Sequence, residues 1–177
     1  MSIFKISSDG KAMEEFHEHD MNEEEILSLF EHHGLRFVEN GLQFVDRNVP
    51  AGHGFIDTLA IDDLKRPVII EYKIDEAASA NALIQSLSYA YNLQKGQEYF
   101  ARYISKKLTS LRVDGIDFDN TRIVLVAPGF EIHVEEAAQL VELPVKLVRY
   151  SICKTSENQA ISTTTVFDST STRGQFT

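Results

Sequence analysis

Hydrophobic positions along the chain change their spacing several times, and these changes predict alternating helices and strands. Apolar residues three and four positions apart predict helices that begin near Asn22 and that cover residues 76–94, 97–108 and 131–142. Alternating or continuous apolar runs predict strands at residues 35–38, 42–50, 55–61, 68–73, 122–127 and 145–152. This order indicates an α/β fold in which a mixed β-sheet is flanked by helices.

Local signals mark the start of the first helix and two turns. Asn22 is a candidate N-cap, and Glu25 three positions later would complete a capping box. The Asn40-Gly41 pair is typical of a tight hairpin and predicts that strands 35–38 and 42–50 pair with each other.

A second hairpin, formed by residues 55–61 and 68–73, carries charged groups where a buried sheet is expected. If the hairpin folds around residues 64–65, Asp57 lies opposite or diagonal to Glu71. Cross-strand neighbours are only ~4.5–5.5 Å apart between Cβ atoms. Because side chains alternate between faces, Lys73 shares the face of Glu71. Two carboxylates and an ammonium group are therefore predicted to meet at the end of a strand.

Two neighbouring carboxylates repel each other unless one is protonated or a cation lies between them. A hard divalent cation with oxygen ligands would fit this arrangement. The alternative is that Asp57 and Glu71 face solvent on an amphipathic hairpin, with Lys73 in a surface ion pair. The hairpin alone leaves both interpretations open.

The helix that follows this hairpin carries Gln85 and Tyr89 one turn apart, on the same face. Taken alone, this pair is compatible with a polar edge and a half-buried aromatic residue. Taken together, Asp57, Glu71-Tyr72-Lys73 and the Gln85–Tyr89 pair resemble two known motifs. These are the D…(D/E)-x-K core of the PD-(D/E)XK nuclease superfamily and the Q-x-x-x-Y motif of its RecB-like branch.

The resemblance covers roughly residues 22–150 and is greatest to small mismatch- and flap-type endonuclease domains of DNA repair. It departs from the family name at Ile56, where that name has Pro. It implies a restriction-endonuclease-like core with elements in the order αβββαβ. It also implies a metal-dependent endodeoxyribonuclease that hydrolyses phosphodiester bonds.

The resemblance assigns roles to individual residues. Asp57, Glu71 and the backbone carbonyl of Tyr72 would bind Mg²⁺ or Mn²⁺, and Lys73 would position or activate the attacking water. Gln85 and Tyr89 would shape the site and contact the nucleic-acid backbone. Relatives also use a glutamate of the first helix. The phase of the apolar residues favours Glu23 over Glu24 for that role, although both also suit a helix N-terminus.

Two other classes of function stay open. The chain could be a catalytically silent nuclease-like domain that binds nucleic acid or protein, or it could be a nuclease that acts on RNA.

Charge is distributed unevenly, which bears on the partner. The net charge is −10, and residues 1–88 hold 17 acids against 7 Lys and Arg. In contrast, residues 95–112 are basic, and Arg102, Lys106 and Lys107 are candidate phosphate contacts. His53 is a further candidate because it lies between two glycines. The basic stretch also carries Tyr99, Phe100 and Tyr103. Aromatic residues among basic ones can bind single-stranded nucleic acid, whereas their helical spacing is also typical of core residues.

Bulk composition predicts a cytoplasmic protein. Apolar residues make up 43% and charged residues 25% of the chain, as in ordinary globular proteins. The single Cys153 excludes internal disulfides and cysteine-based zinc sites. No run reaches the length of a membrane span, and the N-terminus lacks the apolar segment of a secretory signal. A homodimer would suit an enzyme that cuts both strands of DNA.

The expected domain organisation has three parts. Residues 1–21 are a loose acidic lead, residues 22–152 form the nuclease-like domain, and residues 153–177 form a tail rich in Ser and Thr with a candidate edge strand at residues 163–167.

Overall fold

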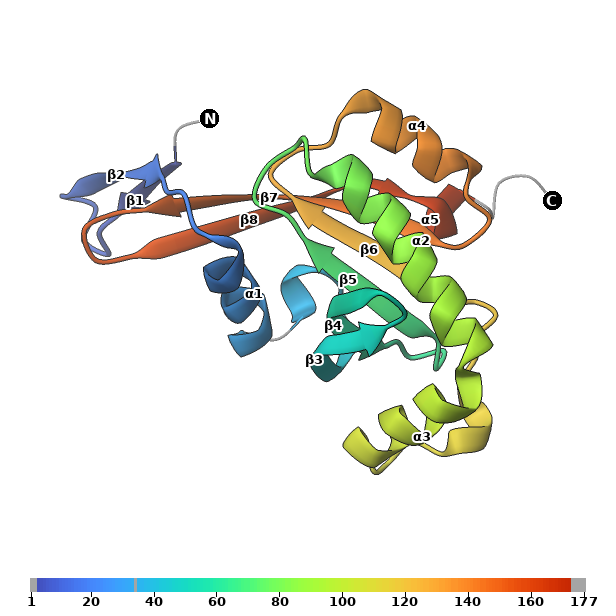
Figure 1. Ribbon diagram of the computed structural model, residues 1–177. Helices are drawn as coiled ribbons and strands as arrows, with labels where there is room; N and C mark the ends of the chain where they lie inside the picture. Colours follow the sequence, from blue (N-terminus) through green and yellow to red (C-terminus); the bar gives the residue numbers. More distant parts are fainter. Residues whose placement is uncertain (1–2, 34, 173–177) are drawn as a thin grey trace.

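One eight-stranded mixed sheet organises the chain, in the order β1-β2-β7-β6-β5-β4-β3, with β8 paired to β7. The computed structural model describes residues 3–33 and 35–172 (Figure 1). The strands are β1 Ile3–Ile6, β2 Met13–Glu18, β3 Gln43–Ala51, β4 Gly54–Ile61, β5 Pro67–Tyr72, β6 Arg122–Ala127, β7 Val145–Lys154 and β8 Gln159–Asp168. The helices are α1 Glu23–His32, α2 Ser79–Lys95, α3 Gln97–Lys107, α4 Ile132–Leu140 and the short α5 Ser169–Thr172. Short 3₁₀ turns occupy Leu35–Phe37 and Val113–Gly115.

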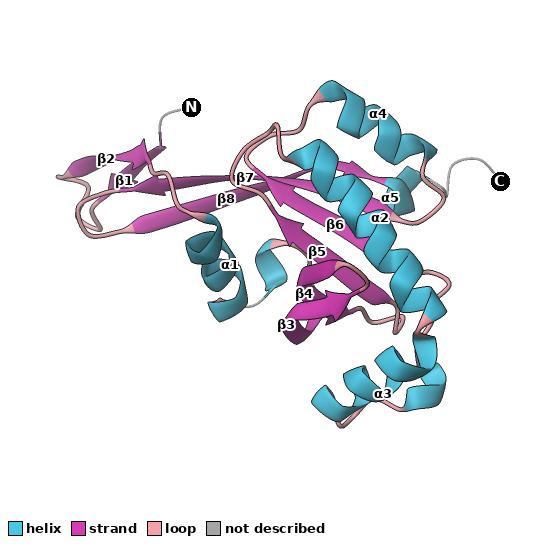
Figure 2. Ribbon diagram, in the orientation of Figure 1, coloured by secondary structure: helices cyan, strands magenta, loops and turns pink. Residues whose placement is uncertain are grey.

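Helices cover both faces of the central sheet (Figures 1 and 2). Strands β3, β4 and β5 form an antiparallel meander, whereas β5, β6 and β7 run parallel and are joined by helical crossovers. Helices α2 and α4 pack on one face, and α1 packs on the other. The predicted αβββαβ order of a mixed sheet flanked by helices is confirmed by α1, β3, β4, β5, α2 and β6. None of the helices in the described part of the chain has the length and hydropathy that a membrane crossing requires.

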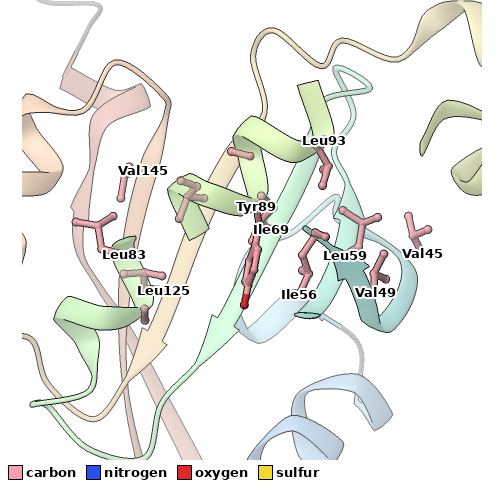
Figure 3. Close-up of a cluster of buried hydrophobic side chains, with 14 of the residues drawn as sticks. Val45, Val49, Ile56, Leu59, Ile69, Leu83, Tyr89, Leu93, Leu125 and Val145 are labelled. Atoms are coloured by element: carbon pink, nitrogen blue, oxygen red, sulfur yellow. The ribbon is translucent and has the colours of Figure 1, made fainter. Parts of the chain in front are cut away.

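Each face of the sheet has its own hydrophobic core. On the α2 face, Leu59, Ile69 and Leu125 pack against Leu83 and Leu93 of the helix (Figure 3). On the α1 face, Ile70 and Tyr72 pack with Phe30 and Val126. Strands β5 and β6 are buried on both faces, which explains why their sequences are continuous apolar runs.

The capping box predicted at the start of α1 is confirmed. The Asn22 N–H donates to Glu25 Oε2 over 2.9 Å, and the Glu25 N–H donates to Asn22 Oδ1 over 2.9 Å. These bonds satisfy two backbone donors that the helix leaves free, so the first turn is fixed. Glu23 and Glu24 therefore project from a defined position.

The predicted strand at residues 35–38 is wrong. Leu35 and Val38 are both buried, and the Val38 N–H donates to the Leu35 carbonyl over 2.8 Å. A spacing of three between buried residues suits a 3₁₀ turn and not a strand. The Asn40-Gly41 turn, with Gly41 at φ 88°, therefore leads into β3 without forming a hairpin, and β3 pairs with β4.

The chain ends differ from the expected lead and tail. Residues 1–21 include β1 and β2, which form an antiparallel hairpin, and His17 of β2 pairs with Lys154 of β7. β8 pairs with β7 from Lys146 to Lys154 and with no other described strand, so the strand predicted at residues 163–167 is part of a longer edge strand of the same sheet. The sequence signal was weak because charged residues interrupt β1 and β2, and because β8 consists mainly of Ser and Thr.

An ion-pair network closes the end of the sheet where β6 begins. The Arg122 guanidinium, 4% exposed, donates to Glu39 Oε1 over 2.7 Å and lies 3.2 Å from Asp62 Oδ2. Lys146 Nζ lies 2.8 Å from Glu39 Oε2. Burial would raise the pKa of Glu39, but hydrogen bonds and charge from Arg122 and Lys146 outweigh it and lower this pKa to about 2.

Glu39→Gln is expected to lower the free energy of unfolding by about 3 kcal/mol at pH 7, because it leaves the buried Arg122 without its main partner. A carboxylate with a lowered folded pKa stabilises the fold above its unfolded value of 4.5 and loses that effect as the pH falls toward 2. The difference from wild type should therefore shrink across this window, as measured by urea denaturation. The exposed Glu136→Gln is the control, and a pH-independent loss would contradict this account.

Candidate active site

Asp57 and Glu71 meet at the point where the ladder between β4 and β5 ends. The last ladder pair is Thr58 with Ile70, so the next pair in register is Asp57 with Glu71, as predicted. The Asp57 N–H donates to Glu71 Oε1 over 3.2 Å, and the Tyr72 N–H donates to Asp57 Oδ2 over 3.0 Å. Each carboxylate thus accepts a hydrogen bond from a backbone N–H of the opposite strand, in place of a backbone carbonyl. These two bonds fix the positions of both side chains.

Lys73 lies among three carboxylates. Its Nζ is 3.6 Å from Glu71 Oε2, 3.7 Å from Asp57 Oδ2 and 3.1 Å from Glu23 Oε1. Of the two candidate glutamates of α1, the structure places Glu23 at this cluster, whereas Glu24 binds Arg47 over 2.8 Å. The cluster thus joins residues from β4, the end of β5 and the first turn of α1.

Burial and mutual repulsion raise the pKa of both carboxyl groups of this pair. Glu71 is 2% exposed, and burial followed by the charge of Asp57 raises its pKa to about 8. Burial also raises the pKa of Asp57. Burial alone would lower the pKa of Lys73, but Asp57, Glu71 and Glu23 outweigh it and raise this pKa. At neutral pH the pair therefore holds a proton, and a bound cation could take the place of that proton.

Tyr89 reaches the carboxylates from α2. Its side chain extends from the helix toward β4 and β5 (Figure 3). Burial, and then the charges of Glu71 and Asp57, raise the pKa of its hydroxyl, which accepts a hydrogen bond from the Phe55 N–H. A Cβ on Gly54 would collide with this hydroxyl, so any other residue at position 54 would have to displace the Tyr89 side chain.

Gln85 lies one turn before Tyr89 on α2 and is solvent-exposed. No hydrogen bond in the described part of the chain joins Gln85 to the carboxylates. Of the two motif residues, the structure brings Tyr89 to the site.

The predicted nucleic-acid contacts are divided between two places. His53 is exposed in the β3–β4 turn, close to the Tyr89 end of the site. Arg102, Lys106 and Lys107 lie on α3, at the far end of α2 (Figure 1). There Lys107 Nζ is 2.5 Å from Asp46 Oδ2, and Arg102 is 3.7 Å from Glu98. These three residues therefore do not contact the carboxylate cluster.

Tyr150 of β7 is a site residue that sequence reasoning missed. Its hydroxyl donates to the Lys73 carbonyl over 3.1 Å and so holds the end of β5. A hollow of about 430 Å³ opens beside it and is lined by Asp20, Ile74 and Pro128, among others. Only the pairing of β7 with β6 brings Tyr150 here, so no local pattern could have identified it.

The described residues contain no group of three or more His, Cys, Asp or Glu arranged to hold a metal ion. Glu23 contacts Lys73. The oxygen donors that the end of the β4–β5 ladder brings together are the carboxylates of Asp57 and Glu71 and nearby backbone. This set suits Mg²⁺, which commonly takes one or two carboxylates and completes its shell with water and substrate phosphate.

Comparisons with known proteins give limited similarity. No family model matches the chain. An uncharacterized protein of Haemophilus influenzae is 28% identical over 127 residues, which are 71% of this chain and 41% of that protein. The chain thus spans about two fifths of the length of this relative.

Two solved structures share part of the fold. A repair endonuclease from Pyrococcus abyssi has a TM-score of 0.43 and 17% identity, over 73% of this chain and 47% of the other. The EndoMS–dsDNA2 complex has a TM-score of 0.44 and 13% identity, over 84% of this chain and 64% of the other. Both TM-scores lie below 0.5, so neither likeness decides the function of this chain.

Proposed function

We propose that this chain is a metal-dependent nuclease that hydrolyses phosphodiester bonds of DNA. The observation that supports the proposal most is the buried pair of Asp57 and Glu71 with Lys73 beside it. Two carboxylates locked by backbone N–H groups at a sheet end are costly for folding, because their charges are desolvated and repel each other. Such a cost is characteristic of functional sites.

Asp57, Glu71 and the carbonyl of Tyr72 would hold Mg²⁺ or Mn²⁺. When bound, such an ion polarises a phosphoryl oxygen and lowers the pKa of a coordinated water. Hard cations of this kind prefer the oxygen donors that these residues supply.

Lys73 would bind and orient the substrate phosphate. Its raised pKa keeps it protonated, so it suits a role in stabilising negative charge better than a role as a base. Glu23 and the Tyr150 contact hold Lys73 in place. Tyr89, and Gln85 at the solvent edge, would border the phosphate on the α2 side.

A titration of Mg²⁺ and Mn²⁺ against labelled DNA tests this function. Branched, mismatched, double-stranded and single-stranded DNA and a matched RNA are each incubated with the full chain. Cleavage of at least one DNA that rises with metal concentration and stops with EDTA is the expected result. If the chain cleaves RNA and none of the DNA substrates, the substrate is RNA and not DNA.

The second candidate is a catalytically silent nuclease-like domain that binds nucleic acid or protein. The acidic surface near the cluster favours it, since Glu18, Asp20 and Glu24 would repel a phosphodiester backbone. Nucleic-acid binding or metal binding without cleavage in the same titration would select this candidate over the enzyme.

A further inference from the structure

Two exposed tyrosines flank the junction of α2 and α3. Tyr91 is 61% exposed and Tyr99 is 62% exposed, although large aromatic side chains are usually buried. Lys95 lies between them in sequence, and its Nζ is 5.8 Å from the Tyr91 ring centroid. Lys95, Tyr99 and Arg102 line a shallow hollow at the junction. We call Tyr91, Lys95 and Tyr99 the tyrosine surface.

The exposed Tyr99 ring packs against a neighbouring ring of α3. It stacks on Tyr103, with centroids 6.2 Å apart and an interplanar angle of 27°. The Tyr103 hydroxyl hydrogen-bonds Asp46 of β3, and Phe100 anchors the helix in the core. The three aromatic residues of α3 therefore differ in environment. Phe100 is buried in the core, Tyr103 links Tyr99 to Asp46 of β3, and Tyr99 is exposed to solvent.

The charge near the tyrosine surface contrasts with the rest of the chain. Lys95 and Arg102 line the hollow there with Glu98 as an acidic neighbour, and Lys106 and Lys107 follow in the last turn of α3, in a chain whose net charge is −10. A local basic surface that carries exposed aromatic rings combines the two features by which proteins hold single-stranded nucleic acid. Aromatic rings can stack on unpaired bases, whereas the bases of a duplex are already stacked on each other.

Helix α2 connects this surface to the candidate active site. Tyr89 and Tyr91 are two residues apart, so at 3.6 residues per turn they lie on nearly opposite sides of the helix. Tyr89 is buried toward the carboxylates, and Tyr91 faces solvent. The tyrosine surface and the carboxylates therefore lie on different sides of the same helix.

We propose that the tyrosine surface binds single-stranded DNA, with unpaired bases stacked on Tyr91 and Tyr99 and a phosphate near Lys95. The choice of DNA rests on the proposed nuclease function. The surface would be a binding site separate from the carboxylate cluster.

Binding is measured separately from cleavage. Fluorescence anisotropy of a labelled 20-nucleotide oligo-dT is recorded with the full-length chain in EDTA, where a metal-dependent nuclease is inactive. A duplex of the same length and an oligo-rU are measured in parallel. Tyr91→Ala and Tyr99→Ala are expected to weaken oligo-dT binding about tenfold each and to leave duplex binding unchanged. Lys95→Gln is expected to reduce the slope of log affinity against log salt by about one.

Matched variants test the mechanism. Tyr91→Phe and Tyr99→Phe keep the stacking ring and should bind like wild type. Ile132→Ala removes an equally exposed apolar side chain on α4 and should also bind like wild type. Unchanged oligo-dT affinity in both Tyr→Ala variants, or equal losses for duplex and single strand, would overturn the inference. Tighter binding of oligo-rU than of oligo-dT would overturn the choice of DNA. If the wild-type chain cleaves DNA but the Tyr→Ala variants bind oligo-dT as wild type does, the proposed nuclease function stands and only the proposed role of the tyrosine surface fails.

Discussion

Glu71→Gln and Asp57→Asn are each expected to lower the rate of DNA cleavage at least a thousandfold, a loss of about 4 kcal/mol in transition-state stabilisation. Either change removes a negative charge from the proposed metal site and leaves a single carboxylate. The amide side chains keep an oxygen that can accept the hydrogen bonds from the Asp57 and Tyr72 N–H groups. The fold should therefore survive, which alanine at either position would not ensure.

Calorimetry with Mn²⁺ separates the loss of metal from a loss of chemistry. Both variants should bind Mn²⁺ more weakly than wild type, and Glu136→Gln, an exposed matched control on α4, should change neither affinity nor rate. Equal Mn²⁺ affinity in wild type and in both variants would remove Asp57 and Glu71 from the metal site.

Without metal, Glu71→Gln is expected to stabilise the chain at alkaline pH. The Glu71 pKa is about 8 in the folded chain, against an ordinary value of 4.5, and burial followed by the charge of Asp57 is the cause. Between these values the folded chain binds more protons than the unfolded chain, so the free energy of unfolding of wild type falls as pH rises through the window. The Gln variant stays neutral and does not carry this cost.

The expected result is a difference near zero at pH 4 that grows to roughly 2–4 kcal/mol in favour of Glu71→Gln above pH 8. Urea denaturation in EDTA at several pH values measures it, and Glu136→Gln should follow wild type throughout. Parallel profiles for wild type and Glu71→Gln would mean that Glu71 is ionised in the folded chain at no cost. Added Mn²⁺ should reverse the order of stability, because it stabilises only a chain that binds it.

The features that could be predicted from the sequence depend on contacts between residues close in the chain. The Asn22–Glu25 capping box spans one helical turn, and the pairing of Asp57 with Glu71 follows from a short turn between two strands. Pattern and spacing are sufficient in such cases, because few alternative geometries compete.

The features that could not be predicted join distant segments. The Arg122–Glu39 ion pair spans 83 positions, and the Tyr150–Lys73 hydrogen bond spans 77. At residues 35–38 the apolar pattern fitted both a strand and a 3₁₀ turn, and packing of Leu35 and Val38 on the α1 face decided between them. The distance between the basic residues of α3 and the carboxylate cluster could likewise not be predicted, because it depends on the direction in which α2 runs across the sheet.

The pairing of β2 with β7 has a consequence for the order in which the chain folds. His17 pairs with Lys154, and Glu14 binds Ser156, 142 positions later. During synthesis β2 leaves the ribosome well before its partner strand β7. Contacts of such long range slow folding and leave strands exposed in the meantime.

The acidic residues of β2 bear on the interval in which β2 has been synthesised and β7 has not. Glu14, Glu15 and Glu18 place like charges along β2, of which only His17 and Glu18 pair with β7. Like charges discourage the edge from pairing with another nascent chain. We therefore expect the acidic residues of β2 to reduce association of the growing chain before its sheet is complete.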